Sequence, residues 1–147
     1  MKPIHPFFFS AVFFIVSFSN FAYANTGLEI DNPTSINIVY TIEPDDISLQ
    51  DVQKRIENLA CHAGISLSSR DDAQLFVRVE KHADAYLLYL DFNRQLFYFA
   101  NGYKHSTKGF VWGRYANNID SQEELFEDLV FFAEEFFSDY QQANTLN

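Results

Sequence analysis

Cysteine is almost absent from this 147-residue sequence, because Cys61 is the only one. An internal disulfide is therefore excluded, and so are the paired-cysteine spacings of structural zinc sites. The sequence also lacks the G-x-S-x-G nucleophile elbow, the H-E-x-x-H zinc motif and the glycine-rich loops that bind phosphates. We therefore expect a non-enzymatic protein with no catalytic residues, no metal and no cofactor.

Basic residues are scarce as well. Ten Lys and Arg stand against twenty Asp and Glu, which gives a net charge of −10. Nucleic acids and anionic lipids are bound through Lys and Arg, so this balance argues against both classes of partner. It favours solubility or a basic partner instead.

Long apolar runs are confined to the N-terminus. Lys2 precedes an apolar run from Phe7 to Phe18, and Ala22-Tyr23-Ala24 has the small-x-small pattern of a signal-peptidase site. The run is shorter than the roughly 20 residues that a membrane span needs. We predict that residues 1–24 are a cleaved signal peptide and that residues 25–147 form a single globular domain. No stable membrane anchor is expected, and the location is periplasmic or secreted.

Cleavage near Ala24 also changes the charge. The leader contains Lys2 and no acidic residue, so nine basic and twenty acidic residues remain, a net charge of −11. The remaining 123 residues contain ten Phe, seven Tyr and one Trp. A chain of that length is able to bury about two-thirds of its unfolded surface in one core.

Apolar residues at regular spacing predict the secondary structure. Alternation predicts strands over residues 35–42 and 74–80. Residues 85–100 are either one long bent strand or two strands broken near Asn93-Arg94. Residues 101–109 are expected to form a loop, and residues 110–115 a last strand.

Capping signals and helical spacing predict two amphipathic helices. Ser48 followed by Asp51 resembles a capping box, and the helix after it should run from about Leu49 to Ala63. Ser121 with Glu124 is a full capping box, which opens a helix to about Ala143.

The resulting order, β-α-β-β-β-α, predicts an α+β fold. Strands joined by short turns indicate an antiparallel sheet of about four strands. Both amphipathic helices are expected to cover one face of that sheet.

The C-terminal helix is rich in phenylalanine and carboxylates. At 100° per residue most of its apolar side chains form one stripe, which predicts a buried face. Phe131 falls outside the stripe, amid Glu127, Glu134 and Glu135. Aromatic residues are enriched at interfaces. We therefore predict Phe131, Glu127, Glu134 and Glu135 as candidate partner contacts, with an ordinary solvated acidic face as the alternative.

The strands place aromatic residues on both sides of the sheet. Phe76 and Tyr89 alternate with the expected helix-facing residues, and Phe97 and Phe99 alternate with Tyr98. We predict Phe76, Tyr89, Phe97 and Phe99 as exposed aromatics of the face away from the helices. Such a face serves as a self-association surface, a ligand platform or the base of a further packing layer.

The residues with potential metal or nucleophile chemistry are dispersed. Cys61 and His62 are adjacent but about 100° apart on a helix, and His82 and His105 lie in expected turns or loops. A nucleophilic cysteine needs a positioned base and a lowered pKa. The pattern favours a quiet, partly covered thiol and ordinary surface histidines.

Several segments resemble a group of small exported Gram-negative proteins of unknown function. They are LQDVQKRIENLACHAGISL, LFVRV, the long strand with Gln95, the strand with Trp112 and the ending FFSDYQQAN. In that group a helix ends in A-G-I, a V-rich strand follows, then a Gln-containing strand, a T-W strand and an F-x-x-D-Y-x-x-A-N ending. Here Gly109-Phe110-Val111 departs from the Thr-rich run before the Trp. The resemblance implies export and this fold, and it implies no site residues.

Three functions are consistent with these features. The favoured one is an exported non-enzymatic domain that binds a protein partner or itself in the cell envelope. The alternative is an immunity-type or inhibitor protein that neutralises a periplasmic toxin or hydrolase. The least favoured is a small hydrolase with dispersed carboxylates, which would have to face each other across a cleft.

Overall fold

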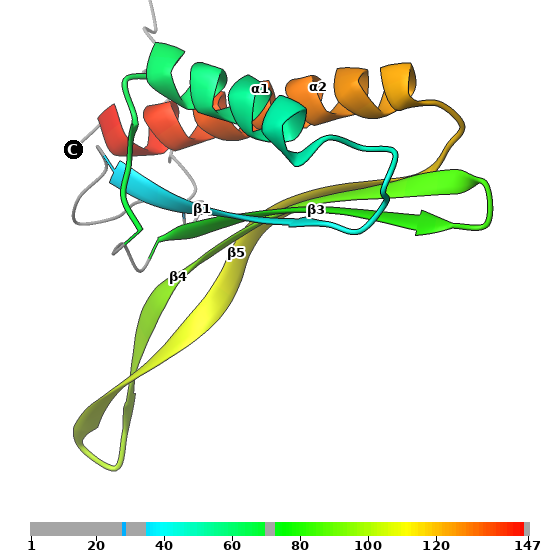
Figure 1. Ribbon diagram of the computed structural model, residues 1–147. Coiled ribbons are helices and arrows are strands. Elements are labelled where there is room, and N and C mark those ends of the chain that lie inside the picture. The colour runs from blue at the N-terminus through cyan, green and yellow to red at the C-terminus, as the bar shows by residue number, and fades with distance from the viewer. Residues whose placement is uncertain (1–27, 29–34, 70–72, 146–147) are drawn as a thin grey trace, which may run out of the picture.

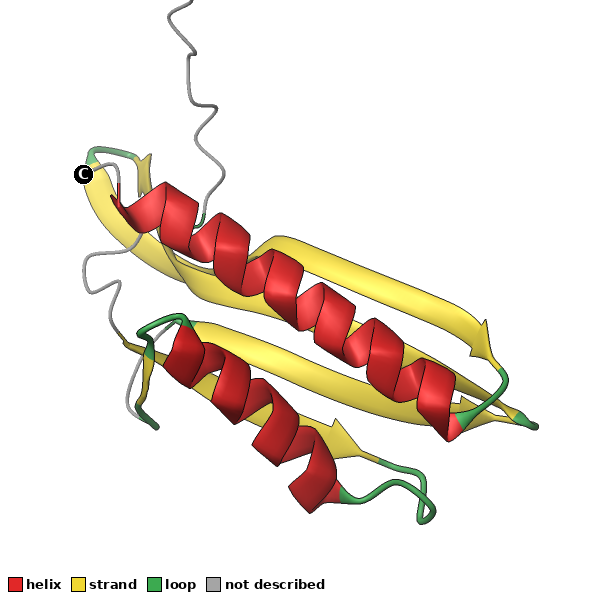
Figure 2. Cartoon of the chain, turned by 90° about the horizontal axis from the view of Figure 1, so that it is seen from above, coloured by secondary structure: helices red, strands yellow, loops and turns green. Residues whose placement is uncertain are grey.

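The computed structural model describes residue 28, residues 35–69 and residues 73–145, so the expected leader lies outside the described residues. Two helices cover one face of a sheet (Figures 1 and 2). The helices are α1 (Leu49–His62) and α2 (Gln122–Thr145). The strands are β1 (Ser35–Ile42), β2 (Ser66–Leu67), β3 (Gln74–His82), β4 (Ala85–Ala100) and β5 (Tyr103–Ile119), in the spatial order β2-β1-β3-β4-β5.

The prediction of an antiparallel sheet of about four strands is wrong, because the sheet has five strands and is mixed. β1 runs parallel to both β2 and β3, whereas the β3–β4 and β4–β5 pairs are antiparallel. The chain between β1 and β3 contains α1, so it crosses over the sheet instead of turning back in a hairpin. Such a crossover returns the next strand in the parallel direction. β2 has two residues, too few for alternation to predict it.

The expected loop at residues 101–109 is instead a two-residue turn followed by the start of β5 at Tyr103. Asn101 and Gly102 form a two-residue turn with φ of 54° and 81°, and Ala100 pairs with Tyr103 across it. Asn-Gly favours such a turn because both central residues need positive φ. β4 is accordingly one strand of 16 residues, without a break at Asn93-Arg94, and β5 has 17 residues.

The outer half of this hairpin leaves the sheet. Residues 95–108, which we call the arm, project as two paired strands away from both helices (Figure 1). The register shifts where Phe92 pairs with Trp112 and Asn93 pairs with Phe110, so Val111 is an extra residue. A β-bulge of this kind bends and twists a strand pair. It lies at the base of the arm.

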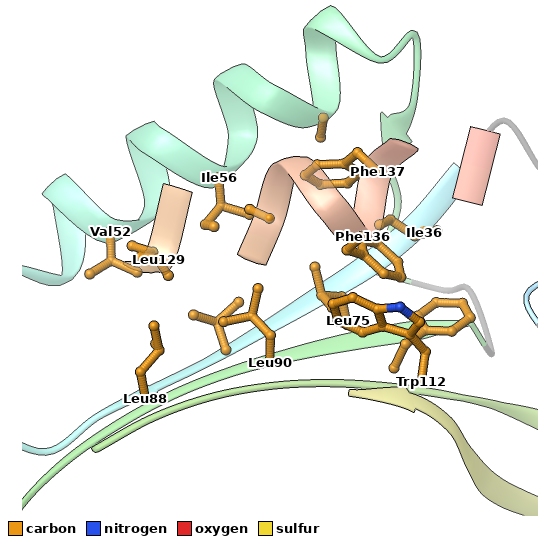
Figure 3. Close-up of a cluster of buried hydrophobic side chains, with 14 of the residues drawn as sticks. Ile36, Val52, Ile56, Leu75, Leu88, Leu90, Trp112, Leu129, Phe136 and Phe137 are labelled. Atoms are coloured by element: carbon orange, nitrogen blue, oxygen red, sulfur yellow. The ribbon is translucent and has the colours of Figure 1, made fainter. Parts of the chain in front are cut away.

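The core fills the space between the helices and the sheet. Figure 3 shows Ile56 of α1 and Phe136 of α2 above Leu75, Leu90 and Trp112 of the strands. Burial of each large apolar side chain contributes about 1.5–3 kcal/mol. The fully buried members include Val52, Ile56, Leu75, Val77, Val79, Leu88, Leu90, Phe92, Leu125, Leu129 and Phe136.

The expected helix starts are confirmed by hydrogen bonds. The Ser48 side chain accepts a hydrogen bond from the backbone N–H of Asp51 at 3.3 Å. The Ser121 hydroxyl accepts one from the N–H of Glu124 at 3.2 Å, and the N–H of Asp120 donates to the Glu124 carboxylate at 3.0 Å. Within the described part of the chain, neither helix is long and apolar enough to cross a membrane.

Candidate interaction surfaces

The sheet face away from the helices, which we call the open face, contains a row of side chains across three strands. Arg78 of β3 pairs with Tyr89 of β4, which in turn pairs with Tyr115 of β5. The two tyrosine rings are stacked with centroids 6.4 Å apart, and the Arg78 guanidinium carbon lies 4.2 Å from the Tyr89 centroid. The same guanidinium lies 3.3 Å from the Glu80 carboxylate, so this row combines a cation–π contact with a compensated charge.

A second row on the open face centres on a carboxylate. Phe76 pairs with Asp91, and Asp91 pairs with Gly113. A Cβ atom at Gly113 would lie 2.6 Å from the ring of Phe110 and 2.8 Å from Asp91 Oδ1, so both groups pack over this glycine. Burial raises the pKa of the Asp91 carboxyl, and the charge of Arg78 opposes part of that rise.

The structure places the expected sheet aromatics in two different regions. Phe76 and Tyr89 belong to the open face, whereas Phe97 and Phe99 lie in the arm. Tyr115 and Phe110, which are 67% and 64% exposed, were not among the predicted aromatics. Because side chains alternate between the two faces of a strand, a buried Trp112 predicts that Tyr115, three residues further on, lies on the open face.

Phe110 could not be found in that way. In an unbroken strand it shares a face with Trp112, two residues away. The extra residue Val111 turns Phe110 to the other face, above Gly113. A bulge has no reliable signal in a single sequence, so Phe110 required the structure.

An open groove of about 470 Å³ lies between the two helices. We call it the helix groove; its lining residues are Arg55, Glu123, Phe126, Glu127, Val130, Phe131 and Glu134. The Arg55 guanidinium carbon lies 4.4 Å from the centroid of Phe126. Three of the four predicted contacts, Glu127, Phe131 and Glu134, therefore meet at one groove with an acidic rim. Phe131 is 61% exposed there.

The fourth predicted contact, Glu135, faces β5 instead. Arg114 Nε donates to Glu135 Oε2 at 2.9 Å. Hydrogen bonding from Arg114 holds the pKa of the Glu135 carboxyl below its usual value. One turn further, Trp112 Nε1 donates to Asp139 Oδ2 at 3.2 Å. Both contacts connect α2 to β5, so the Glu135 carboxylate already has an intramolecular partner.

The arm is covered with exposed rings. Lys104 Nζ lies 3.8 Å from the centroid of Phe97, and the rings of Tyr98 and His105 are stacked with centroids 5.2 Å apart. Phe99 is the most exposed large apolar residue in the described part of the protein, at 77%. The other exposed rings of the arm are Phe97, Tyr98 and Tyr103.

The residues with metal or nucleophile chemistry stay dispersed in the structure. Across residues 35–69 and 73–145, no cluster of three or more His, Cys, Asp or Glu side chains is placed to bind a metal ion. Cys61 is exposed near the end of α1.

No protein-family model matches the chain, and no curated protein matches it. Among solved structures it is similar to a minor lipoprotein from Acinetobacter baumannii, at 10% identity over 74% of this chain and 90% of the other, with a TM-score of 0.24. A similarity at that level supports no conclusion about function. The resemblance to the small exported proteins therefore rests on its short motifs.

Proposed function

We propose that this chain is an exported, non-enzymatic binding protein of the cell envelope that associates with a second copy of itself through the open face. The broader form of this proposal is that the open face binds a protein of the cell envelope other than a second copy of this chain. The export part rests on the leader-like residues 1–24.

One observation supports the binding role above the others. Both helices lie on the same face of the sheet, and the aromatic rings of Tyr115 and Phe110 are largely exposed on the opposite face. Tyr, Phe and Arg are the residue types enriched at interface centres. Exposed apolar patches of several hundred Å² on a monomer usually indicate a contact surface.

Light scattering across a concentration series tests self-association. We expect the native chain to show a mass above that of a monomer, and Tyr115→Ser and Phe110→Ser to shift it towards the monomer. Phe131→Ser is the matched control, because it removes an exposed ring from the helix side of the molecule. A native chain that stays monomeric at every concentration would refute the association with itself.

Export has its own test, independent of the oligomeric state. We expect the chain recovered from the periplasm to begin at Asn25, as determined by N-terminal sequencing. A product that still begins at Met1 would contradict the predicted cleavage.

The helix groove favours the second candidate, an inhibitor of a periplasmic toxin or hydrolase. Its acidic rim around Phe126 and Phe131 is complementary to a basic protein surface. If this function holds, Phe131→Ser and Glu127→Gln should abolish protection against the toxin, while Tyr115→Ser should not. Loss of protection only in the Tyr115 variant would assign inhibition to the open face instead.

A further inference from the structure

The basic residues of this acidic protein are not evenly distributed. No Asp or Glu occurs from Phe92 to Ile119, a stretch that contains Arg94, Lys104, Lys108 and Arg114. Arg114 is paired with Glu135 of α2. Among the residues that the structure describes, Lys104 and Lys108 form no ion pair; Lys108 Nζ donates instead to the Gln74 side chain at 3.1 Å. The arm is therefore a local cationic region, which the net charge of −10 conceals.

The rings of the arm are present on both of its sides. Residues paired directly across an antiparallel ladder share a side, and neighbours along a strand alternate. Phe97 and Phe99 consequently share one side with Lys104, while Tyr98 and Tyr103 share the other with His105. A protein groove would contact one side and leave the other in water. A medium that surrounds the tip would cover both.

The position of the arm adds a further restriction. Its tip lies at the opposite side of the molecule from α2 (Figure 1). Eight acidic residues lie between Asp120 and Asp139, and no Lys or Arg follows Arg114. A flat anionic surface would attract the arm and repel α2. Since charges in physiological salt are screened beyond about 8 Å, an arm that holds the acidic helix away from the surface removes most of that repulsion.

We infer that the arm docks on the surface of a lipid bilayer with anionic headgroups. Lys104, next to the tip, attracts the headgroups. The rings of Phe97, Phe99 and Tyr103 enter the interfacial layer, where Tyr is enriched in membrane proteins and where the Phe side chains of interfacial segments are buried. The β4–β5 ladder pairs the inward-facing backbone N–H and C=O groups of the arm, and the outward-facing groups remain hydrogen-bonded to water in the interfacial layer. This peripheral contact goes beyond the proposed association through the open face.

A second copy is a less suitable occupant of the same surface. The helix groove has a volume of about 470 Å³, and Arg55 already lies over its ring Phe126. The arm presents four exposed rings on two sides, whereas a single groove on a second copy contacts one of those sides. Charge complementarity between arm and groove exists, but the groove covers too little of the arm.

Vesicle flotation of the chain recovered from the periplasm of an expression host tests the inference. We expect binding to vesicles of equimolar phosphatidylcholine and phosphatidylglycerol, weaker binding at high salt, and little binding to phosphatidylcholine alone. Lys104→Gln should weaken binding about fivefold, and Phe99→Ser by a similar factor. The matched controls are Lys54→Gln and Phe131→Ser, which remove an exposed lysine and an exposed ring from the helix layer and should leave binding unchanged.

Insertion of the tip has a separate spectroscopic readout. In Tyr103→Trp the new indole should shift its emission to shorter wavelength when anionic vesicles are added, while the buried Trp112 should not respond. The inference fails if the native chain does not float with anionic vesicles, or if Lys104→Gln and Lys54→Gln weaken binding equally. It also fails if Phe99→Ser lowers the oligomeric mass and leaves flotation unchanged, because the arm would then contact a second copy.

Discussion

Asp46 connects three parts of the fold. It accepts hydrogen bonds from Lys81 Nζ of β3 at 2.6 Å and from the Tyr86 hydroxyl of β4 at 2.7 Å. Its backbone carbonyl accepts a third from the Gln122 side chain, at the start of α2, at 2.9 Å. The loop before α1 is thereby attached both to the sheet and to the other helix.

This network predicts a pH dependence of stability. The hydrogen bond from Lys81, and then that from Tyr86, lower the pKa of Asp46 below its ordinary value of 3.8. A carboxyl whose pKa is lower in the folded state contributes stability above its unfolded pKa and loses it as the pH falls through the folded pKa. In urea unfolding, Asp46→Asn should be less stable than the native chain at neutral pH.

The difference in unfolding free energy between the two proteins should shrink as the pH falls below that ordinary value. Asp45→Asn is the control, because the neighbouring exposed carboxylate makes no such pair of hydrogen bonds among the described residues. A difference that stays constant down to the acid limit of folding would contradict the prediction.

Gly113 determines how the open face packs. An alanine there would place its Cβ 2.6 Å from the Phe110 ring, closer than side chains tolerate. We expect Gly113→Ala to lower the unfolding free energy by about 1 kcal/mol, at the low end for overpacking because the exposed ring is able to move. In the Phe110→Ala background, Gly113→Ala should lower the unfolding free energy by a smaller amount. Equal costs in both backgrounds, measured by a double-mutant cycle, would show that the ring does not rest on Gly113.

Two hydrogen bonds at the start of α2 stabilise its first turn, and the contribution of this cap to the unfolding free energy is measurable. The Ser121 hydroxyl accepts from the N–H of Glu124, and the Glu124 carboxylate accepts from the N–H of Asp120. Ser121→Ala should therefore lower the unfolding free energy by about 1 kcal/mol, and Ser121→Asp should retain most of it. Chemical denaturation of the three proteins checks this. If both variants lose the same amount, the cap itself contributes little.

The elements with dense local signals could be predicted from sequence. The alternation of Leu75, Val77 and Val79 identified the buried side of β3, and the stripe on α2 separated the exposed Phe131 from the buried Phe136. These patterns depend only on the period of one helix or strand. The caps at Ser48 and Ser121 are equally local, and the structure confirms them.

The relations between elements could not be predicted in the same way. The parallel pairing of Ile38 with Leu75 depends on a crossover through α1, and no local pattern distinguishes it from an antiparallel pair. The Asn101-Gly102 turn, in contrast, had a local signal that the sequence analysis read as a loop. That error hid the paired strands of the arm, and with them the separation of charge on which the lipid inference rests.

The separation of charge across the molecule predicts opposite responses to salt. Acidic residues are concentrated around α2, so their mutual repulsion is present in the folded protein and is screened by added salt. Unfolding temperature should rise with sodium chloride, while binding to anionic vesicles should fall. Thermal unfolding and flotation in the same salt series test the pair. If unfolding temperature and vesicle binding change in the same direction as salt is added, the proposed separation of charge between the arm and α2 is contradicted.

The core lies between the helices and the sheet, so the arm should be removable without loss of the fold. Leu96 pairs with Thr107 four steps from the Ala100–Tyr103 pair, and the antiparallel ladder repeats every two residues. Deletion of residues 97–100 and 103–106 therefore lets the Asn101-Gly102 turn close on Leu96 and Thr107 in its native geometry. The shortened chain should keep its unfolding temperature within a few degrees and lose flotation with anionic vesicles. Phe97→Ser combined with Phe99→Ser, in the full-length arm, is the control for chain length and should lose most of the flotation too. If the shortened chain no longer unfolds cooperatively, the arm is part of the folding unit and its rings serve stability first.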